Sequence, residues 1–292
     1  MNYEQAEKNL KERLADNPCR GIVLGMGEDR TLRQFSWIMG RSSNSQNRFY
    51  QRNVGGVDLR TAPADVSKVE DPRLIIYNAM NHCSPCHIVS NGDQTDTVSA
   101  EFMERSHKTH HSAFVQALDS RFCEPDAPTF TPRITGYQAA GENIAYLALL
   151  RADPVAREIW TGVVKSSGLT KDQFKKPGMK DSEATEEYNK AIGKRAGFNH
   201  QQFPTIRSFF ELPLDSWHGF CLTTYKPGSK ALDSFEGEPF IVPIFGSLEE
   251  SAMNLWNHLD DGGANWRVAF AGKEIQPDGE YRMFVHNTRQ KV

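Results

Sequence analysis

The sequence contains no long hydrophobic run, no marked excess of charge of either sign and few cysteines. A membrane-spanning helix needs about 18 consecutive apolar residues, and no stretch approaches that length, so we expect no membrane association. The 292 residues include 34 basic and 37 acidic side chains, which give a formal net charge of -3. Because no global basic field would attract phosphates, this balance does not favour a nucleic-acid-binding protein. Any anionic ligand must be bound by a local group of residues.

The five cysteines are an odd number in a chain of this size, and the first twenty residues are charged rather than apolar. These features predict a cytoplasmic protein with reduced thiols rather than a secreted disulfide framework. An apolar content of 38% is sufficient for a substantial core, and the sequence has neither internal repeats nor low-complexity segments. We therefore expect one domain over residues 1–292.

Short apolar runs bounded by glycine or proline predict β-strands, and these runs come in pairs. The expected strands are residues 21–25, 34–39, 74–80, 133–136, 144–150, 203–214, 219–225, 239–245, 267–271 and 281–285. The expected helices are residues 3–14, 99–122 and 248–259. Residues 54–69 are interpreted as loop or edge, and the Lys- and Glu-rich residues 168–200 as a peripheral helical insertion. Paired strands with helices in separate blocks indicate an α+β fold with antiparallel sheets.

Three short polar segments lie beside apolar, strand-like runs, at residues 40–48, 77–78 and 90–96. Rigid strand ends would present their side chains as a dense array of hydrogen-bond donors. In the first segment, Arg41 and Arg48 bracket a turn rich in Ser and Asn. Guanidinium groups match a phosphate bidentately, and hydroxyls and amides supply neutral donors around it. The pattern favours a site for a polar, anionic small molecule, although a surface turn with structural arginines would have the same composition.

Several polar motifs occur in one order at residues 21–25, 38–48, 77–79, 90–96 and 131–134. In this order the chain resembles the archaeal-type IMP cyclohydrolase family, and residues 203–210 and 234–239 resemble its longer bacterial members. The resemblance implies a four-layer αββα sandwich like that of N-terminal-nucleophile hydrolases, without a processed nucleophile. It also implies a cofactor-free reaction of purine biosynthesis, the ring closure of 5-formamidoimidazole-4-carboxamide ribonucleotide to inosine monophosphate. A purine mononucleotide would be the substrate, and the protein would form a homo-oligomer.

Such a substrate needs groups that hold its phosphate and its base. For the phosphate we expect the two arginines with neighbouring hydroxyls and amides, namely Arg41, Ser42, Ser43, Asn44, Asn47 and Arg48. Arg133 would serve there or polarise the formyl oxygen. For the base or carboxamide we expect neutral hydrogen bonds from Asn78, Asn91 and Gln94, because an unpaired buried amide discriminates sharply against a wrong ligand.

Proton transfer needs groups within hydrogen-bond reach of the carboxamide nitrogen and the formyl oxygen. Tyr77 and Glu124 are the candidates, with Asp93 and Asp126 as substitutes. Tyr77 would equally suit the core as a tyrosine with a satisfied hydroxyl. The segment Glu124-Pro125-Asp126 is also typical of a turn, since Pro and Asp favour turns.

Cysteines and histidines suggest a metal site that we do not favour. The spacing of Cys83 and Cys86, followed by His87, matches haem attachment and suits zinc, and further imidazoles come from His82, His107, His110 and His111. Structural zinc needs four ligands, and one cysteine pair is visible, so we expect no metal. Reduced thiols in a loop and solvated histidines on a helix explain the same residues.

Two alternatives to the ring closure remain open. Cys19 precedes Gly21-Ile22, as in amidohydrolases whose chain begins at a nucleophilic cysteine, and processing after Pro18 would create that arrangement. A non-catalytic purine nucleotide-binding protein would keep the phosphate-binding residues without the groups for proton transfer.

Overall fold

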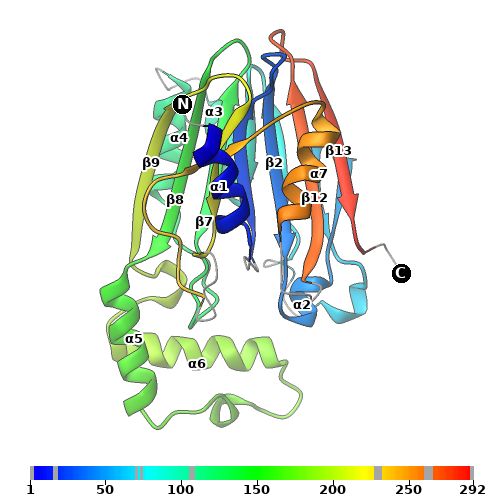
Figure 1. Ribbon diagram of the computed structural model, residues 1–292. Helices are drawn as coiled ribbons and strands as arrows, with labels where there is room; N and C mark the ends of the chain where they lie inside the picture. Colours follow the sequence, from blue (N-terminus) through cyan, green and yellow to red (C-terminus); the bar gives the residue numbers. More distant parts are fainter. Residues whose placement is uncertain are drawn as a thin grey trace.

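Two antiparallel β-sheets pack face to face in the computed structural model, which describes residues 3–15, 19–69, 72, 75–104, 109–226, 232–259 and 266–289 (Figure 1). The six-stranded sheet has the order β11-β10-β1-β2-β12-β13. Its strands are β1 (Gly21–Met26), β2 (Leu32–Met39), β10 (His218–Thr223), β11 (Phe240–Pro243), β12 (Arg267–Ile275) and β13 (Tyr281–Asn287). The prediction of an α+β fold with antiparallel sheets is confirmed.

The seven-stranded sheet follows the order of the chain, from β3 to β9. Its strands are β3 (Phe49–Val54), β4 (Val57–Ala62), β5 (Asn78–Cys83), β6 (Cys86–Ser90), β7 (Arg133–Ala139), β8 (Ile144–Ala152) and β9 (Thr205–Pro213). Short turns join β3 to β4, β5 to β6 and β7 to β8, whereas helices lie in the connections from β6 to β7 and from β8 to β9. The β3–β4 turn consists of Gly55 and Gly56, whose φ angles of 65° and 81° are those of a two-residue hairpin turn.

Helices cover the outer face of each sheet (Figure 1). Helices α1 (Tyr3–Arg13) and α7 (Leu248–His258) pack on the six-stranded sheet, whereas α3 (Gln94–Met103) and α4 (His110–Asp119) pack on the seven-stranded sheet. A helical segment with α5 (Pro154–Ser166) and α6 (Asp181–Ala196) extends beyond the end of the sheets at which the short α2 (Ser43–Gln46) lies (Figure 1). Three 3-10 turns complete the described elements, η1 (Val66–Lys68), η3 (Lys171–Phe174) and η4 (His200–Gln202). None of the helices in the described ranges is both long and apolar enough to cross a membrane.

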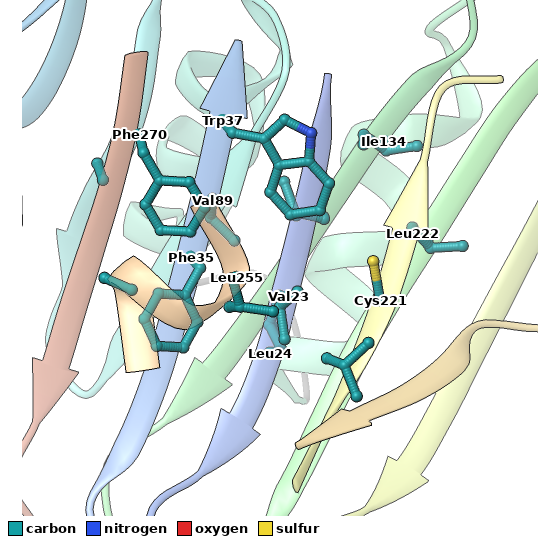
Figure 2. Packing of buried hydrophobic residues seen from close by; sticks show 14 of the residues in the cluster. Val23, Leu24, Phe35, Trp37, Val89, Ile134, Cys221, Leu222, Leu255 and Phe270 are labelled. Atoms are coloured by element: carbon teal, nitrogen blue, oxygen red, sulfur yellow. The ribbon is translucent and has the colours of Figure 1, made fainter. Parts of the chain in front are cut away.

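The largest hydrophobic cluster fills the space between the sheets and beneath α7. Every residue of β1 and β2 is buried, because one face of these strands meets helices and the other meets the second sheet. Figure 2 shows the stacked rings of Trp37 and Phe270 in this cluster, with Leu255 of α7 nearby and Ile134 from the seven-stranded sheet. The apolar runs at residues 21–25 and 34–39 are strands, as predicted, and the structure places them at the centre of the six-stranded sheet.

Four expectations differ from the structure. Residues 57–62 form β4, which lies between β3 and β5 and is therefore neither a loop nor an edge strand. The strand expected at residues 74–80 begins at Asn78, and Leu74 lies outside the described residues. The single helix expected at 99–122 is two helices, and Thr109 caps the second by accepting a hydrogen bond from Ser112 N. The helical segment starts before the expected insertion, because Asp153 caps α5 by accepting from Val155 N and Ala156 N.

Candidate functional site

A pocket of about 350 Å³ opens at the end of the sheets near α2. At this end β2 and β10 finish while β1 and β7 begin, since neighbouring antiparallel strands run in opposite directions. Segments distant in the sequence therefore meet there. The lining consists of Cys19, Arg20, Met39, Gly40, Arg41, Ser42, Ser45, Arg48, Ile75, Glu124, Asp126, Thr129, Thr131, Tyr225 and Leu232.

One wall of the pocket is the turn from Gly40 to Arg48. Ser42 Oγ accepts a hydrogen bond from Ser45 N at 3.1 Å, which closes the turn. A Cβ on Gly40 would lie 2.6 Å from the Cβ of Ser45, so glycine permits this close approach. Arg41 stands at the exposed rim, with its guanidinium 5.1 Å from the ring centre of Trp266.

Arg48 is the buried cation of this wall, with 5% of its surface exposed. Its Nε donates to Ser45 O at 3.0 Å, and no carboxylate in the described part of the chain forms an ion pair with it. Burial lowers the pKa of Arg48 below its ordinary value, opposed in part by Tyr77 and Glu124. A bound anion would compensate this buried charge.

Arg20 and Glu124 form a bidentate ion pair across the pocket. The Arg20 Nη1 and Nη2 atoms lie 2.8 and 2.9 Å from the two carboxylate oxygens, and Nη1 also donates to Asn91 O at 2.9 Å. Burial alone would lower the pKa of Arg20, but the Glu124 carboxylate raises it well above the ordinary value. Both oxygens of Glu124 are thus committed to one guanidinium, which fixes the orientation of this carboxylate.

A second carboxylate in the pocket is bound by Thr131. Asp126 accepts hydrogen bonds from Thr131 N at 2.7 Å and from Thr131 Oγ1 at 2.5 Å. The Thr131 hydroxyl also contacts Tyr225 OH at 2.6 Å. Burial, followed by the charge of Glu124, raises the pKa of Asp126 to about 7. The pocket therefore contains two carboxyl groups in different environments.

Tyr77 lies directly before β5 and is 5% exposed. Its hydroxyl is buried and has no hydrogen-bond partner among the described residues. The Thr61 hydroxyl accepts from Tyr77 N at 2.9 Å and so fixes the backbone there. Tyr77 is not among the residues that line the pocket, although its side chain is close enough to Arg48 and Arg20 to affect the pKa values of both.

The polar segment at residues 90–96 forms a cluster beside the pocket rather than its lining. Arg133 donates to Asp93, to Gln94 Oε1 and to Phe122 O, and Arg121 also pairs with Asp93. Although burial would raise the pKa of Asp93, the charge of Arg133 lowers it. Gln94 in turn donates to Asn91, whose carbonyl oxygen accepts from Arg20. This cluster is therefore one contact removed from the pocket.

The remaining predicted residues have other partners. The side chain of Asn47 exchanges two hydrogen bonds with the backbone of Asp65, both at 2.7 Å, and Asn78 donates to Asp96. Ser43 begins α2 outside the lining, and the side chain of Asn44 lies outside the described residues. The structure thus brings Arg41, Ser42, Arg48, Glu124 and Asp126 together in one pocket. The lining also includes polar residues to which the sequence assigned no role, among them Arg20, Ser45, Thr131 and Tyr225.

The cysteine alternatives can be compared with the same geometry. Cys19 lines the pocket, but burial raises the pKa of its thiol to about 12, which disfavours the nucleophilic thiolate. Cys83 and Cys86 are free cysteines that lie opposite each other in the β5–β6 hairpin. The ring of His82 forms a hydrogen bond with Asp58. Within the described ranges, which omit His107, no group of three or more His, Cys, Asp or Glu residues is arranged to hold a metal ion.

Comparison with known proteins identifies a family for most of the chain. A family model described as IMP cyclohydrolase-like protein matches residues 18–201, which is more than half of the chain. No curated protein matches the sequence significantly.

Proposed function

Since the chain belongs to the IMP cyclohydrolase-like family, we propose that it converts 5-formamidoimidazole-4-carboxamide ribonucleotide to inosine monophosphate in the pocket at residues 19–48, 124–131 and 225. The family supports a related activity, and the pocket supplies groups suited to this substrate. We also infer that the arrangement of helices outside two packed sheets corresponds to the fold of N-terminal-nucleophile hydrolases.

The observation that carries the proposal is the charge of the pocket. Three arginines, Arg20, Arg41 and Arg48, face two carboxyl groups, of which Asp126 has a pKa near neutrality. Arg48 in particular is a buried cation without a carboxylate partner in the described structure. A nucleoside monophosphate would supply the missing negative charge, with Ser42 and Ser45 as neutral donors beside it.

In the proposed reaction, the carboxamide nitrogen forms a bond with the formyl carbon, and the formyl oxygen leaves as water. The two protons of that water come from the carboxamide nitrogen and the formamide nitrogen. Glu124 is proposed to accept the carboxamide proton, while the Tyr77 hydroxyl, which has no partner among the described residues, donates its proton to the formyl oxygen. The proton held by Glu124 then replaces the one that Tyr77 has lost, so both groups return to their starting states. Holding both reacting groups of one molecule in contact would supply further rate acceleration.

Arg133 has a different proposed role, because its hydrogen bonds with Asp93 and Gln94 hold it outside the pocket lining. Through Asn91 this cluster supports the guanidinium of Arg20. We therefore assign Arg133, Asp93, Gln94 and Asn91 to the positioning of Arg20.

The experiment is to mix purified protein with the formamido ribonucleotide and follow product formation by ultraviolet absorbance. Catalytic formation of inosine monophosphate supports the proposal. Tight binding of inosine monophosphate without turnover would instead support a non-catalytic nucleotide-binding protein. Absence of both would refute the assignment of the pocket.

A further inference from the structure

Hydrogen bonds connect the side chains of Asp126, Thr131 and Tyr225 in a chain, and all three residues line the pocket. The Thr131 hydroxyl lies 2.5 Å from Asp126 Oδ2 and 2.6 Å from Tyr225 OH. Tyr225 is 4% exposed, and Thr131 is also 4% exposed. The hydroxyl of Thr131 is therefore placed between a carboxyl group and a phenol.

The backbone around Tyr225 is fixed by contacts at the end of β10. Tyr225 forms an isolated β-bridge with Ser234, and the Thr223 hydroxyl donates to Tyr225 O at 2.8 Å. Thr224 N donates to Arg20 O at 3.0 Å, which ties this segment to the residue that binds Glu124. Tyr225 lies beyond residues 18–201, so the family match does not cover it.

We propose that Tyr225, acting through Thr131, positions Asp126 as the proton-carrying carboxyl group of the pocket, an assignment that rests on the proposed ring closure. Asp126 and Glu124 would then have separate tasks. Glu124, with both oxygens bound to Arg20, accepts a proton in a fixed orientation, whereas Asp126 delivers one. Two carboxyl groups in unlike environments are a common way to divide acid and base roles.

The surroundings of Asp126 support this division. Burial and the negative charge of Glu124 raise its pKa to about 7, while the Thr131 hydrogen bonds and the charge of Arg20 act in the opposite direction. The other titratable groups that interact with it are Cys123 and Tyr225. A carboxyl group of this kind holds a proton in a large fraction of molecules at neutral pH.

The hydroxyl groups of Thr131 and Tyr225 accommodate both protonation states of Asp126. When Asp126 is ionised, Thr131 donates to it and Tyr225 donates to Thr131. When Asp126 is protonated, it donates to Thr131, which donates to Tyr225, so the contacts of Thr131 with Asp126 and with Tyr225 are kept in both states. Because each hydroxyl can both donate and accept, reversal of the chain needs only rotation of two O–H bonds.

The proton transfer occurs at the dehydration step. Protonated Asp126 gives its proton to the hydroxyl of the cyclised intermediate as the C–O bond breaks, and the oxygen leaves as water with the electron pair of that bond. The adjacent ring nitrogen then forms a double bond to the same carbon and loses its proton. That proton returns to Asp126, so the carboxyl group ends the cycle in its starting state.

The first test compares Thr131→Val with Thr131→Ser, because valine removes the hydroxyl and serine retains it. We expect kcat of the wild type to fall as pH rises through about 7, where Asp126 loses its proton. In Thr131→Val the ionised carboxylate loses a hydrogen bond, so the pKa of Asp126 should rise and the decrease in kcat should move to higher pH by about one unit. Thr131→Ser should return the decrease to the pH of the wild type. Tyr225→Phe should shift it in the same direction by less, with KM changed by no more than about twofold.

Asp126→Asn should lower kcat by about 100-fold and abolish the decrease in kcat near pH 7. Tyr3→Phe serves as the control for loss of a phenolic hydroxyl, because Tyr3 lies on α1 with 49% exposure. Identical pH profiles in wild type, Thr131→Val and Tyr225→Phe would overturn the proposal. Near-ultraviolet circular dichroism establishes that each variant is folded.

A second measurement does not depend on activity. Infrared difference spectra of wild type and Asp126→Asn should reveal a protonated carboxyl band that disappears near pH 7, shifts in Thr131→Val and returns in Thr131→Ser. If the band titrates as expected but no ring closure occurs, the proposed function fails and the proton-carrying carboxyl stands. If ring closure occurs but the band is missing or does not respond to Thr131→Val, the present inference fails alone.

Discussion

Replacement of Arg48 by methionine should separate ligand binding from stability. The substitution keeps an unbranched apolar side chain in place of the guanidinium, at a position with 5% exposure. A charge-assisted contact between this guanidinium and a phosphate contributes about 3 kcal/mol. Its loss should weaken binding of inosine monophosphate by roughly 150-fold.

The stability of the unliganded protein should respond differently. The described structure shows one hydrogen bond for Arg48, from Nε to Ser45 O, and its loss would cost about 1 to 2 kcal/mol. Removal of a buried cation near Arg20 acts in the opposite direction, because burial and the charge of Arg20 both lower the pKa of Arg48. We therefore expect the free energy of unfolding to change by no more than about 1 kcal/mol.

Isothermal titration calorimetry with inosine monophosphate measures the first effect, and urea denaturation without ligand measures the second. Arg52→Met is the matched control, since Arg52 is exposed on β3 and donates to Met283 O. It should leave the affinity unchanged. If Arg48→Met lowered the free energy of unfolding by more than about 3 kcal/mol and kept the wild-type affinity, Arg48 would be a structural residue and the phosphate assignment would be wrong.

Two further experiments follow from the pocket. Arg41→Ala should weaken nucleotide binding with little change in kcat, whereas Tyr77→Phe should lower kcat by at least about tenfold with little change in affinity. Steady-state kinetics and calorimetry check this pair, and the reverse pattern would move Tyr77 to a packing role. Iodoacetamide at pH 8 should leave Cys19 unmodified in the folded protein, because the pKa of its thiol is about 12. Peptide mass analysis detects the modification, and an active species beginning at Cys19 would favour amide hydrolysis.

Strand β1 could be predicted because burial on both faces leaves a continuous apolar run, whereas the equally buried strand β2 also contains Arg33, Gln34 and Ser36. Residues 21–26 and 32–39 are buried throughout, and the sequence indicates both strands. Strand β3 has exposed positions at Arg52 and Asn53, and its partner β4 was interpreted as loop. Their pairing depends on the turn at Gly55–Gly56 and on the neighbouring strand β5, which local composition does not reveal.

The site was predictable where its residues are close in the sequence. Arg41 and Arg48 belong to one turn, so a common orientation toward one cavity was a reasonable expectation. Arg133 has the same chemistry, but its partner Asp93 comes from a different segment and holds it outside the lining. Tyr225 reaches the pocket because β10 pairs with β1, and that long-range pairing could not be read from either segment alone.

The strand order of the six-stranded sheet determines which parts of the chain must be present together. A fragment ending at residue 201 would retain β1 and β2 but lack β10 and β12, the strands on either side of that pair. Two strands that are fully buried in the complete fold would then have unpaired backbone groups along their outer edges, a situation that favours aggregation. The last third of the polypeptide is thus as necessary to the shape of the pocket as the segment that defines its family.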